Sequence, residues 1–198
     1  MAKNNCEFLQ ESIGWCEGKF NVPGIRRTIY FTACANVVKA PDLPVDEQGR
    51  PTDVTLVGKF ELKADAVFHK VEGVPNKNQH TSDPQGDIYS QTQQEKLSFF
   101  FPATDADGTK LELNFNNVQN FVIFQDAMGN WRCLRNAFGT QISKVKQDSG
   151  TSITDSVGST LEIEDVDKVS APFLPKGIVI PTDDGDITLG EAPAVPGN

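Results

Sequence analysis

The chain has 198 residues, a formal net charge of −9 and 38% hydrophobic residues, which suits one domain with a single core and extended arms. The acidity argues against a surface that grips nucleic acid, because phosphate binding needs clustered lysine and arginine side chains. It is compatible with a surface that nucleic acid slides past, since carboxylates repel phosphates.

Residues 1–24 have no clear periodicity, and we expect them to form an arm that carries Trp15 and Phe20. Large aromatic side chains are favoured anchors in protein contacts, so the arm docks either on its own domain or on a neighbouring subunit. Two long polar segments, 39–53 and 73–87, are predicted to be loops. Loops of this length are usually functional or interfacial.

Alternating and β-branched runs predict a series of strands. The first covers residues 25–38, and the next two cover 54–62 and 66–72. A longer strand is expected at 88–101. It ends at Pro102, because proline has no N–H group to donate to a ladder.

The segment 104–117 is predicted to be a helix. Thr104 and Asp107 resemble a capping box, and Leu111 and Phe115 follow at helical spacing. Leucine and phenylalanine also alternate within this segment, so a strand is the alternative.

A hairpin is expected at 121–134. A further pair follows, with one strand at 142–147, a turn at 148–150 and the start of the return strand at 151–154, and another strand is expected at 159–165. Residues 169–174 are predicted to form an edge strand, because Pro172 excludes a central position in a sheet.

The predicted fold class is mainly β, an antiparallel β-sandwich or barrel with one flanking α-helix, an extended N-terminal arm and long loops. We divide the chain into an N-terminal arm at 1–24, a β domain at 25–174 and an acidic, proline-containing C-terminal tail at 175–198. The tail forms either a small hairpin or a mobile extension.

Cysteine and histidine usage gives no sign of a metal or cofactor site. No cysteine forms a C-x-x-C pair, and the chain has only two histidines. Zinc sites need such ligands at short spacing, so we expect no metal and no cofactor. No export signal or membrane-spanning stretch is visible, so we expect reduced thiols and no membrane partner. The cysteines are Cys6, Cys16, Cys34 and Cys133.

No familiar catalytic or nucleotide-binding motif is present. The carboxylates Glu162, Glu164, Asp165 and Asp167 could supply an acid–base pair, but on an alternating strand we interpret them as the solvated face. The acidic run 183–186 lacks the ligand spacing of a calcium loop, so we interpret it as a solvated turn. We therefore expect a protein that is not an enzyme.

Several short motifs stand in a characteristic order. They are Pro23-Gly24-Ile25 before the strand 28–30, the run 58–63 before 66–68, and Phe101-Pro102 before a helix, the strand within 117–125 and the turn at 126–130. This order resembles that of bacteriophage major tail tube proteins over roughly residues 20–174.

The resemblance implies a β-sandwich or barrel whose copies form stacked, hexameric rings around a DNA conduit. The partners would be other copies of the chain and other virion tail proteins, and the location would be the virion tail after assembly in the host cytoplasm. DNA would pass without specific binding, along a lumen that we expect to be acidic. The alternative is a non-catalytic β-sandwich module that binds a carbohydrate or a protein.

We expect subunit contacts to come from the arm and the two long loops. The residues proposed for these contacts are Trp15, Phe20, Pro44, Arg50, Pro75 and His80.

Overall fold

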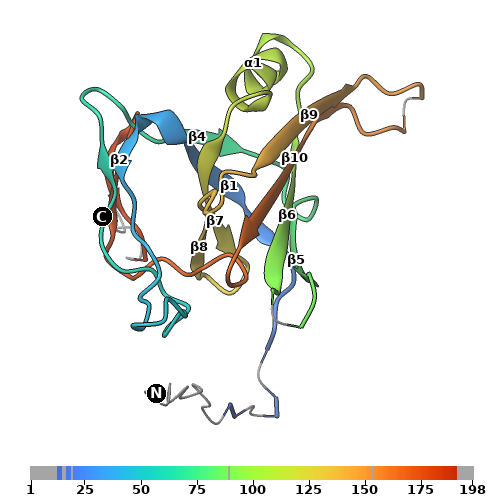
Figure 1. The fold of residues 1–198 in the computed structure, drawn as a ribbon. Helices are drawn as coiled ribbons and strands as arrows, with labels where there is room; N and C mark the ends of the chain where they lie inside the picture. The colour runs from blue at the N-terminus through green and yellow to red at the C-terminus, as the bar shows by residue number, and fades with distance from the viewer. Residues whose placement is uncertain (1–12, 15–16, 19, 89, 153, 191–198) are drawn as a thin grey trace, which may run out of the picture.

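The computed structural model describes residues 13–190 except 15–16, 19, 89 and 153. This part of the chain is a mainly β fold with antiparallel sheets and a single helix, which confirms the predicted fold class (Figure 1). Two four-stranded sheets pack face to face, and no closed barrel is found in the described part of the chain. Of the two predicted alternatives, the sandwich is therefore the one that forms.

The first sheet, which we call the central sheet, has the strand order β4-β1-β7-β8. Its strands are β1 (Ile25–Ala33), β4 (His69–Glu72), β7 (Asn120–Asp126) and β8 (Trp131–Leu134). The second, which we call the outer sheet, has the order β5-β6-β10-β9. Its strands are β5 (Gln79–Gln85), β6 (Thr92–Phe101), β9 (Ile142–Asp148) and β10 (Gly158–Asp167).

Both faces of the central sheet are buried. On β7, Val122 and Phe124 belong to the core between the two sheets, whereas Ile123 belongs to a second core behind the central sheet, and all three are fully buried. A strand buried on both faces reads as a continuous apolar run, as residues 121–124 do.

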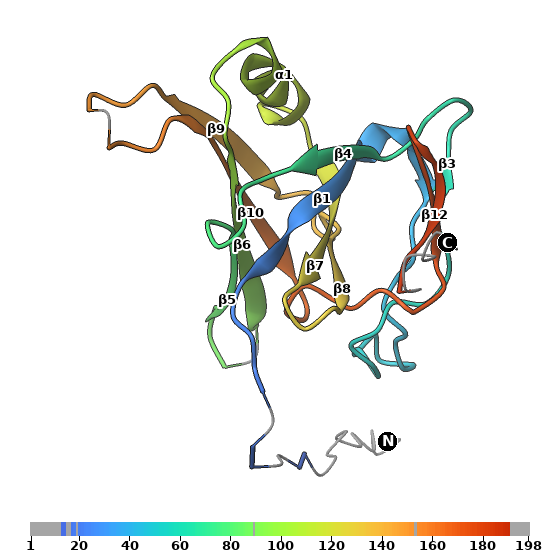
Figure 2. The same cartoon turned by 180° about the vertical axis from the view of Figure 1, so that it is seen from behind.

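A third layer covers the back of the central sheet (Figure 2). It contains the two-stranded sheet of β2 (Val37–Lys39) with β3 (Glu61–Leu62), which the long segment 40–60 connects, and the hairpin of β11 (Val179–Thr182) with β12 (Gly185–Thr188). Its buried side chains include Leu56, Phe60, Ile180 and Leu189. The acidic segment after residue 175 therefore forms the hairpin alternative, and Ile180 and Leu189 anchor it in the second core.

The single helix, α1 (Ala106–Phe115), closes one end of the sandwich (Figure 1). Leu111 and Phe115 are buried, and the Phe115 ring packs against Phe31 with 4.6 Å between centroids. The helix prediction is confirmed, but the cap is Asp105, whose carboxylate accepts from the N–H groups of Asp107 and Gly108. The predicted capping pair was one residue out of register.

Five strand predictions were wrong in extent. The strands expected at 66–72 and 88–101 begin only at His69 (β4) and Thr92 (β6). Residues 54–60 form only isolated bridges, because this segment crosses the second core instead of joining a sheet, and regular pairing begins at β3. The first strand ends at Ala33, where a 3₁₀ turn, η1 (Cys34–Asn36), precedes β2. Strand β10 begins at Gly158, so the hairpin turn after β9 is longer than predicted.

The segment 73–87, predicted to be a loop, contains strand β5. Its sequence is polar because one face is solvated and its inward positions hold His80 and Ser82 in place of apolar residues. The edge strand predicted at 169–174 does not form as a regular strand. Phe173 makes isolated bridges to Arg132 on one side and to Thr55 on the other, so it is not at an edge, and the Pro172 carbonyl accepts a hydrogen bond from the Cys133 N–H.

Candidate functional site

The outer sheet leaves one face open to solvent. On β10 the inward residues Leu161 and Ile163 are fully buried, while Glu162 between them is exposed. The same alternation on β9 turns Lys144 and Lys146 outward. The third layer covers the back of the central sheet. Among the described residues, the broad sheet face that no other layer covers is therefore the outward face of the outer sheet.

Charges on this open face are nearly balanced. Three lysines and four acidic residues occupy its outward positions, although the whole chain carries −9. Strand register places Lys144 opposite Glu162 and Lys96 opposite Glu164. Opposite charges at directly facing positions stabilise a sheet and cancel each other's field at a distance. The seven residues are Asp83, Lys96, Lys144, Lys146, Asp148, Glu162 and Glu164.

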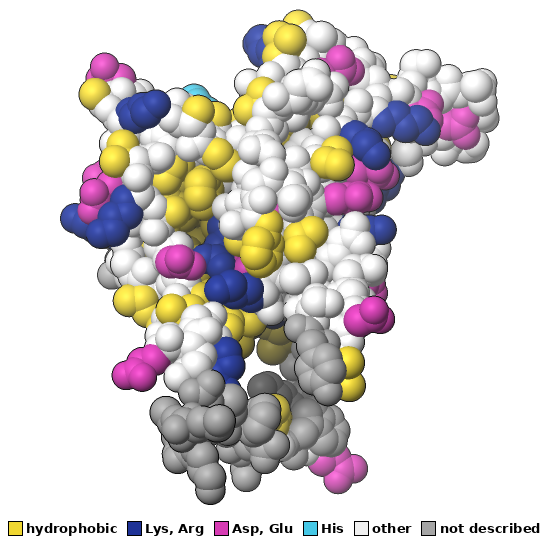
Figure 3. All heavy atoms as spheres, in the orientation of Figure 1, with side chains coloured by type: hydrophobic (Ala, Val, Ile, Leu, Met, Phe, Trp, Pro, Cys, Tyr) yellow, Lys and Arg dark blue, Asp and Glu magenta, His cyan; other side chains and the backbone are white. Residues whose placement is uncertain are grey.

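On the face drawn in Figure 3, acidic and basic side chains of the described residues are interspersed, and hydrophobic side chains gather in the hollow between the third layer and the sandwich. A cavity of about 290 Å³ bordered by Pro41, Arg135 and Phe138 lies in this part of the fold.

The two edges of the outer sheet differ. At the β9 edge, Asn116, which follows the helix, accepts a hydrogen bond from the Val145 N–H at 2.9 Å, so one outward backbone group is already occupied. At the other edge, no backbone hydrogen bond joins β5 to any described strand except β6. An unpaired edge can accept a further strand. The β5 edge is therefore the more open of the two.

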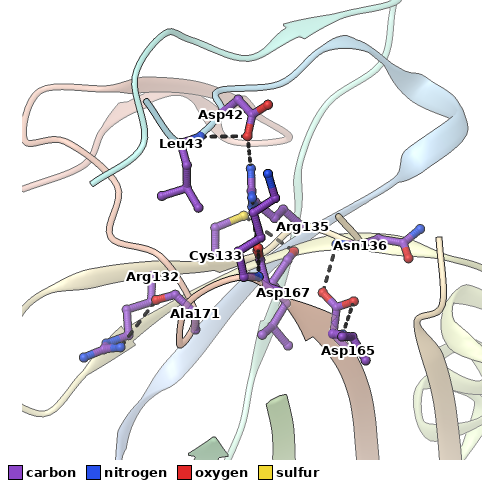
Figure 4. A network of polar contacts seen from close by, with 12 residues as sticks. Asp42, Leu43, Arg132, Cys133, Arg135, Asn136, Asp165, Asp167 and Ala171 are labelled. Carbon is purple, nitrogen blue, oxygen red and sulfur yellow. Dashed lines mark hydrogen bonds and ion pairs between the residues drawn. The ribbon is translucent and has the colours of Figure 1, made fainter. Parts of the chain in front are cut away.

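A buried ion pair fixes the long segment after β2 to the sandwich (Figure 4). Arg135 donates to both carboxylate oxygens of Asp167, at 2.6 and 2.9 Å, and also to Asp42. The side chains of Arg135 and Asp167 are 8% and 3% exposed, whereas that of Asp42 is 80% exposed. Asp42 thus tethers a solvent-exposed segment to a buried anchor.

A second polar cluster lies inside the sandwich. Glu95 is fully buried, with His80 Nε2 2.6 Å from one oxygen and the Ser82 hydroxyl donating to the other at 2.7 Å. The carboxylate stands between histidine and serine, so Ser82 is not activated by His80 as a nucleophile would be. The arrangement satisfies a buried charge.

Asp165 faces Glu95 across the strand pair and is 1% exposed. Burial raises the pKa of this carboxyl to about 6, while backbone N–H groups of Asn136 and Val166 lower it and the charges of Asp167 and Glu95 raise it further. This pKa lies in a range where the group titrates near neutrality.

A β-bulge opens a groove at the start of the central sheet. Ile25 pairs with Asp126 and Ile29 with Phe124, so three residues on β1 face one on β7. Such bulges bend the strand and re-aim side chains. The resulting bulge groove has a volume of about 610 Å³, and Pro23, Arg26, Arg27, Tyr30, Pro75 and Trp131 line it.

The structure separates the residues predicted to make subunit contacts. Phe20 is 86% exposed, and Pro75 is exposed at the rim of the bulge groove. Pro44 and Arg50 lie in the predicted loop, where Arg50 folds back on Asp46 with 2.7 Å between Nε and Oδ2. Trp15 lies outside the described residues.

His80 is the exception among these residues. Its side chain is 11% exposed and packs against Phe124 inside the sandwich, with 5.0 Å between ring centroids. We therefore do not retain it as a contact residue. A buried carboxylate one strand away explains its position, and this partner was not visible in the sequence.

Sequence reasoning also missed the Arg135 anchor and the bulge groove. The prediction that Asp165 and Asp167 lie on the solvated face was wrong, because they continue the inward alternation of Leu161 and Ile163 and are buried. Carboxylates at inward positions need a buried partner, which predicts an arginine nearby without identifying it. No sequence signal marks the bulge, since it depends on the register between two distant segments.

The described residues contain no group of three or more histidine, cysteine, aspartate or glutamate side chains placed to hold a metal ion. Helix α1 is too short and too polar to cross a membrane.

Comparison with known proteins gives no match: no family model, curated protein or solved structure is found to be similar to this chain. The likeness to tail tube proteins therefore stays a prediction, and the function must be argued from the fold and its surfaces.

Proposed function

We propose that this protein is the structural subunit of a bacteriophage tail tube, a non-catalytic protein whose copies form stacked, hexameric rings around a DNA conduit. The observation that carries the proposal is the bare, charge-balanced face of the outer sheet. In this arrangement that face lines the lumen, and the third layer and helix lie outside.

The burial pattern supports this orientation. The sheet that forms a tube wall needs one broad face that no other layer covers, and its opposite face must pack in the hydrophobic core. The outer sheet has both, because Leu97, Phe99 and Ile163 fill the sandwich while Lys96 and Glu162 remain exposed. The open β5 edge supplies backbone groups through which the sheet can continue into a neighbour.

Charge pairing supplies a physical reason for DNA to slide. Each lysine that contacts a phosphate adds a salt-dependent grip, and repeated rings would multiply it. Glu162 and Glu164 face Lys144 and Lys96 across the strands, so two of the three lysines of this face have a carboxylate directly opposite, while Lys146 lies opposite Thr160. The proposed lumen wall is therefore nearly neutral, and this proposal takes the place of the acidic lumen expected from the net charge of the whole chain.

The proposal is tested by the assembly state of the purified full-length protein. Negative-stain micrographs and sedimentation velocity over a range of concentrations should show rings or tubes without any added ligand. A single monomeric species at every concentration would overturn it.

The bulge groove favours one alternative, a module that binds a carbohydrate or a protein. Tyr30 and Trp131 lie in the groove with 5.9 Å between ring centroids, and such aromatic surfaces are common in binding sites. This alternative predicts a monomer whose melting temperature rises with a ligand, whereas the tube subunit assembles alone.

A further inference from the structure

The bulge groove combines positive charge with apolar walls. Arg26 and Arg27 occupy the bulge itself, and Tyr30, Trp131 and Pro75 form the surrounding surface. Arg27 already forms an ion pair with Glu72 at 2.7 Å, whereas Arg26 is exposed and has no ion pair within the described residues. A ligand that fits this groove must bring a negative charge and an apolar group side by side.

The turn between β5 and β6 offers this combination. Asp87 is exposed, and the side chain of the adjacent Ile88 is 78% exposed. We call these two residues the acidic knob. They present a carboxylate and an aliphatic side chain to solvent side by side, the combination that the groove accommodates.

A hydrogen bond and a glycine define the described part of the turn that carries the acidic knob. The Asp87 carbonyl accepts from the Ser90 N–H at 2.8 Å. Gly86 has a φ of +96°, and a Cβ atom there would lie 2.6 Å from the Ser90 carbonyl oxygen, so only glycine fits this position without strain.

We propose that the acidic knob of one copy of the chain binds in the bulge groove of a second copy, with Asp87 facing Arg26 and Ile88 packing among the apolar walls. Charge complementarity selects this occupant, because the chain supplies both the unpaired arginine and an acidic, apolar turn. The inference deepens the proposed function by assigning a pair of contact surfaces, and it rests on that function in taking the partner to be a second copy.

Charge reversal tests the pairing on the full-length chain. Arg26→Glu and Asp87→Arg should each weaken self-association by about tenfold or more in sedimentation velocity, because each places like charges together. The double variant R26E/D87R exchanges the two charges between the groove and the acidic knob, which restores their attraction. It should therefore assemble nearly as the wild type does. Ile88→Ser should weaken assembly without changing the charge.

Lys59→Glu is the matched control, since it changes the net charge as Arg26→Glu does at an exposed position on another segment. It should leave assembly unchanged, and thermal melting should show that all variants fold. Normal assembly of the single variants, or no recovery in the double variant, would overturn the pairing and leave the proposed function standing. A wild-type protein that stays monomeric would overturn both.

Discussion

Arg135 and Asp167 form a bidentate ion pair at the inner end of β10, with both side chains almost fully buried. Burying two charges costs free energy that their mutual attraction offsets only while both are present. The pair therefore stabilises the fold less by its own strength than by preventing an uncompensated charge in the core.

We predict that Arg135→Met destabilises the protein by about 3–5 kcal/mol, because it leaves Asp167 buried without its partner. The double variant R135M/D167L should recover most of that loss. Urea unfolding of the three proteins measures both effects. A single variant within about 1 kcal/mol of the wild type would show that Asp167 is solvated or otherwise compensated.

Asp42→Asn is the control for this pair, since Asp42 is mostly exposed and the buried anchor stays intact. Its effect on global stability should stay below about 1 kcal/mol. Limited proteolysis should nevertheless cut the segment after β2 faster, because the tether to Arg135 is weakened.

Asp165 predicts a pH dependence of stability. Burial raises the pKa of its carboxyl from 3.8 to about 6, so the folded protein binds this proton more tightly than the unfolded chain does. The stabilisation is complete below pH 3.8 and is lost as the pH rises towards 6. A shift of this size corresponds to about 3 kcal/mol.

Asp165→Asn removes this titration while keeping the shape of the side chain. The difference in unfolding free energy between the variant and the wild type should move in favour of the variant as the pH rises from 4 to 7. Comparing the two proteins at each pH cancels the other carboxylates, such as Asp46, whose pKa is lowered by hydrogen bonds from the Arg50 backbone and side chain. A difference that does not vary with pH would refute the assignment.

Gly108 predicts an effect opposite to helix propensity. Replacing a helical glycine by alanine normally stabilises a helix by about 1 kcal/mol. Here a Cβ atom would lie 2.5 Å from the Ala103 carbonyl oxygen and 2.9 Å from the Ser159 hydroxyl, which donates to that carbonyl. Gly108→Ala should therefore destabilise the protein by roughly 1–3 kcal/mol in thermal or urea unfolding. Increased stability would mean that the helix shifts freely on the sheet.

Glu162 tests the charge balance of the proposed lumen wall. Glu162→Lys removes the acidic neighbour of Lys144 and creates a positive stripe on the open face. Assembled particles of this variant should retain duplex DNA at low salt and release it as salt increases, while wild-type particles do not. The control Glu61→Lys changes the charge equally on β3, away from this face. Equal DNA retention by both variants would show that the added positive charge, and not its position on the open face, causes the binding.

The parts of the fold that could be predicted are those in which one periodicity dominates. The alternation of Leu161 with Ile163 and the helical spacing of Leu111 with Phe115 reflect burial on one face, and both elements formed. Strand β5 was missed because its inward residues are polar and are satisfied by a carboxylate on another strand. A local pattern cannot show a partner that is distant in the chain.

The same limit applies to the candidate surfaces. Exposure of Phe20 and Pro75 agrees with an expectation based on loop and arm composition. The bulge groove depends on strand register, and so does the position of Lys144 opposite Glu162. The pattern of residues within one strand does not determine this register. The charge of the open face could not be predicted from the net charge, because strand order decides which residues share it.

The central claim is that the open face of the outer sheet lines a conduit formed by many copies of the chain. Cryo-electron microscopy of the purified, assembled protein tests it most directly. The account predicts stacked rings whose channel wall is formed by β5, β6, β10 and β9, with Lys144 and Glu162 facing the channel. Rings whose channel is lined by the third layer or the helix, or a protein that forms no rings, would contradict it.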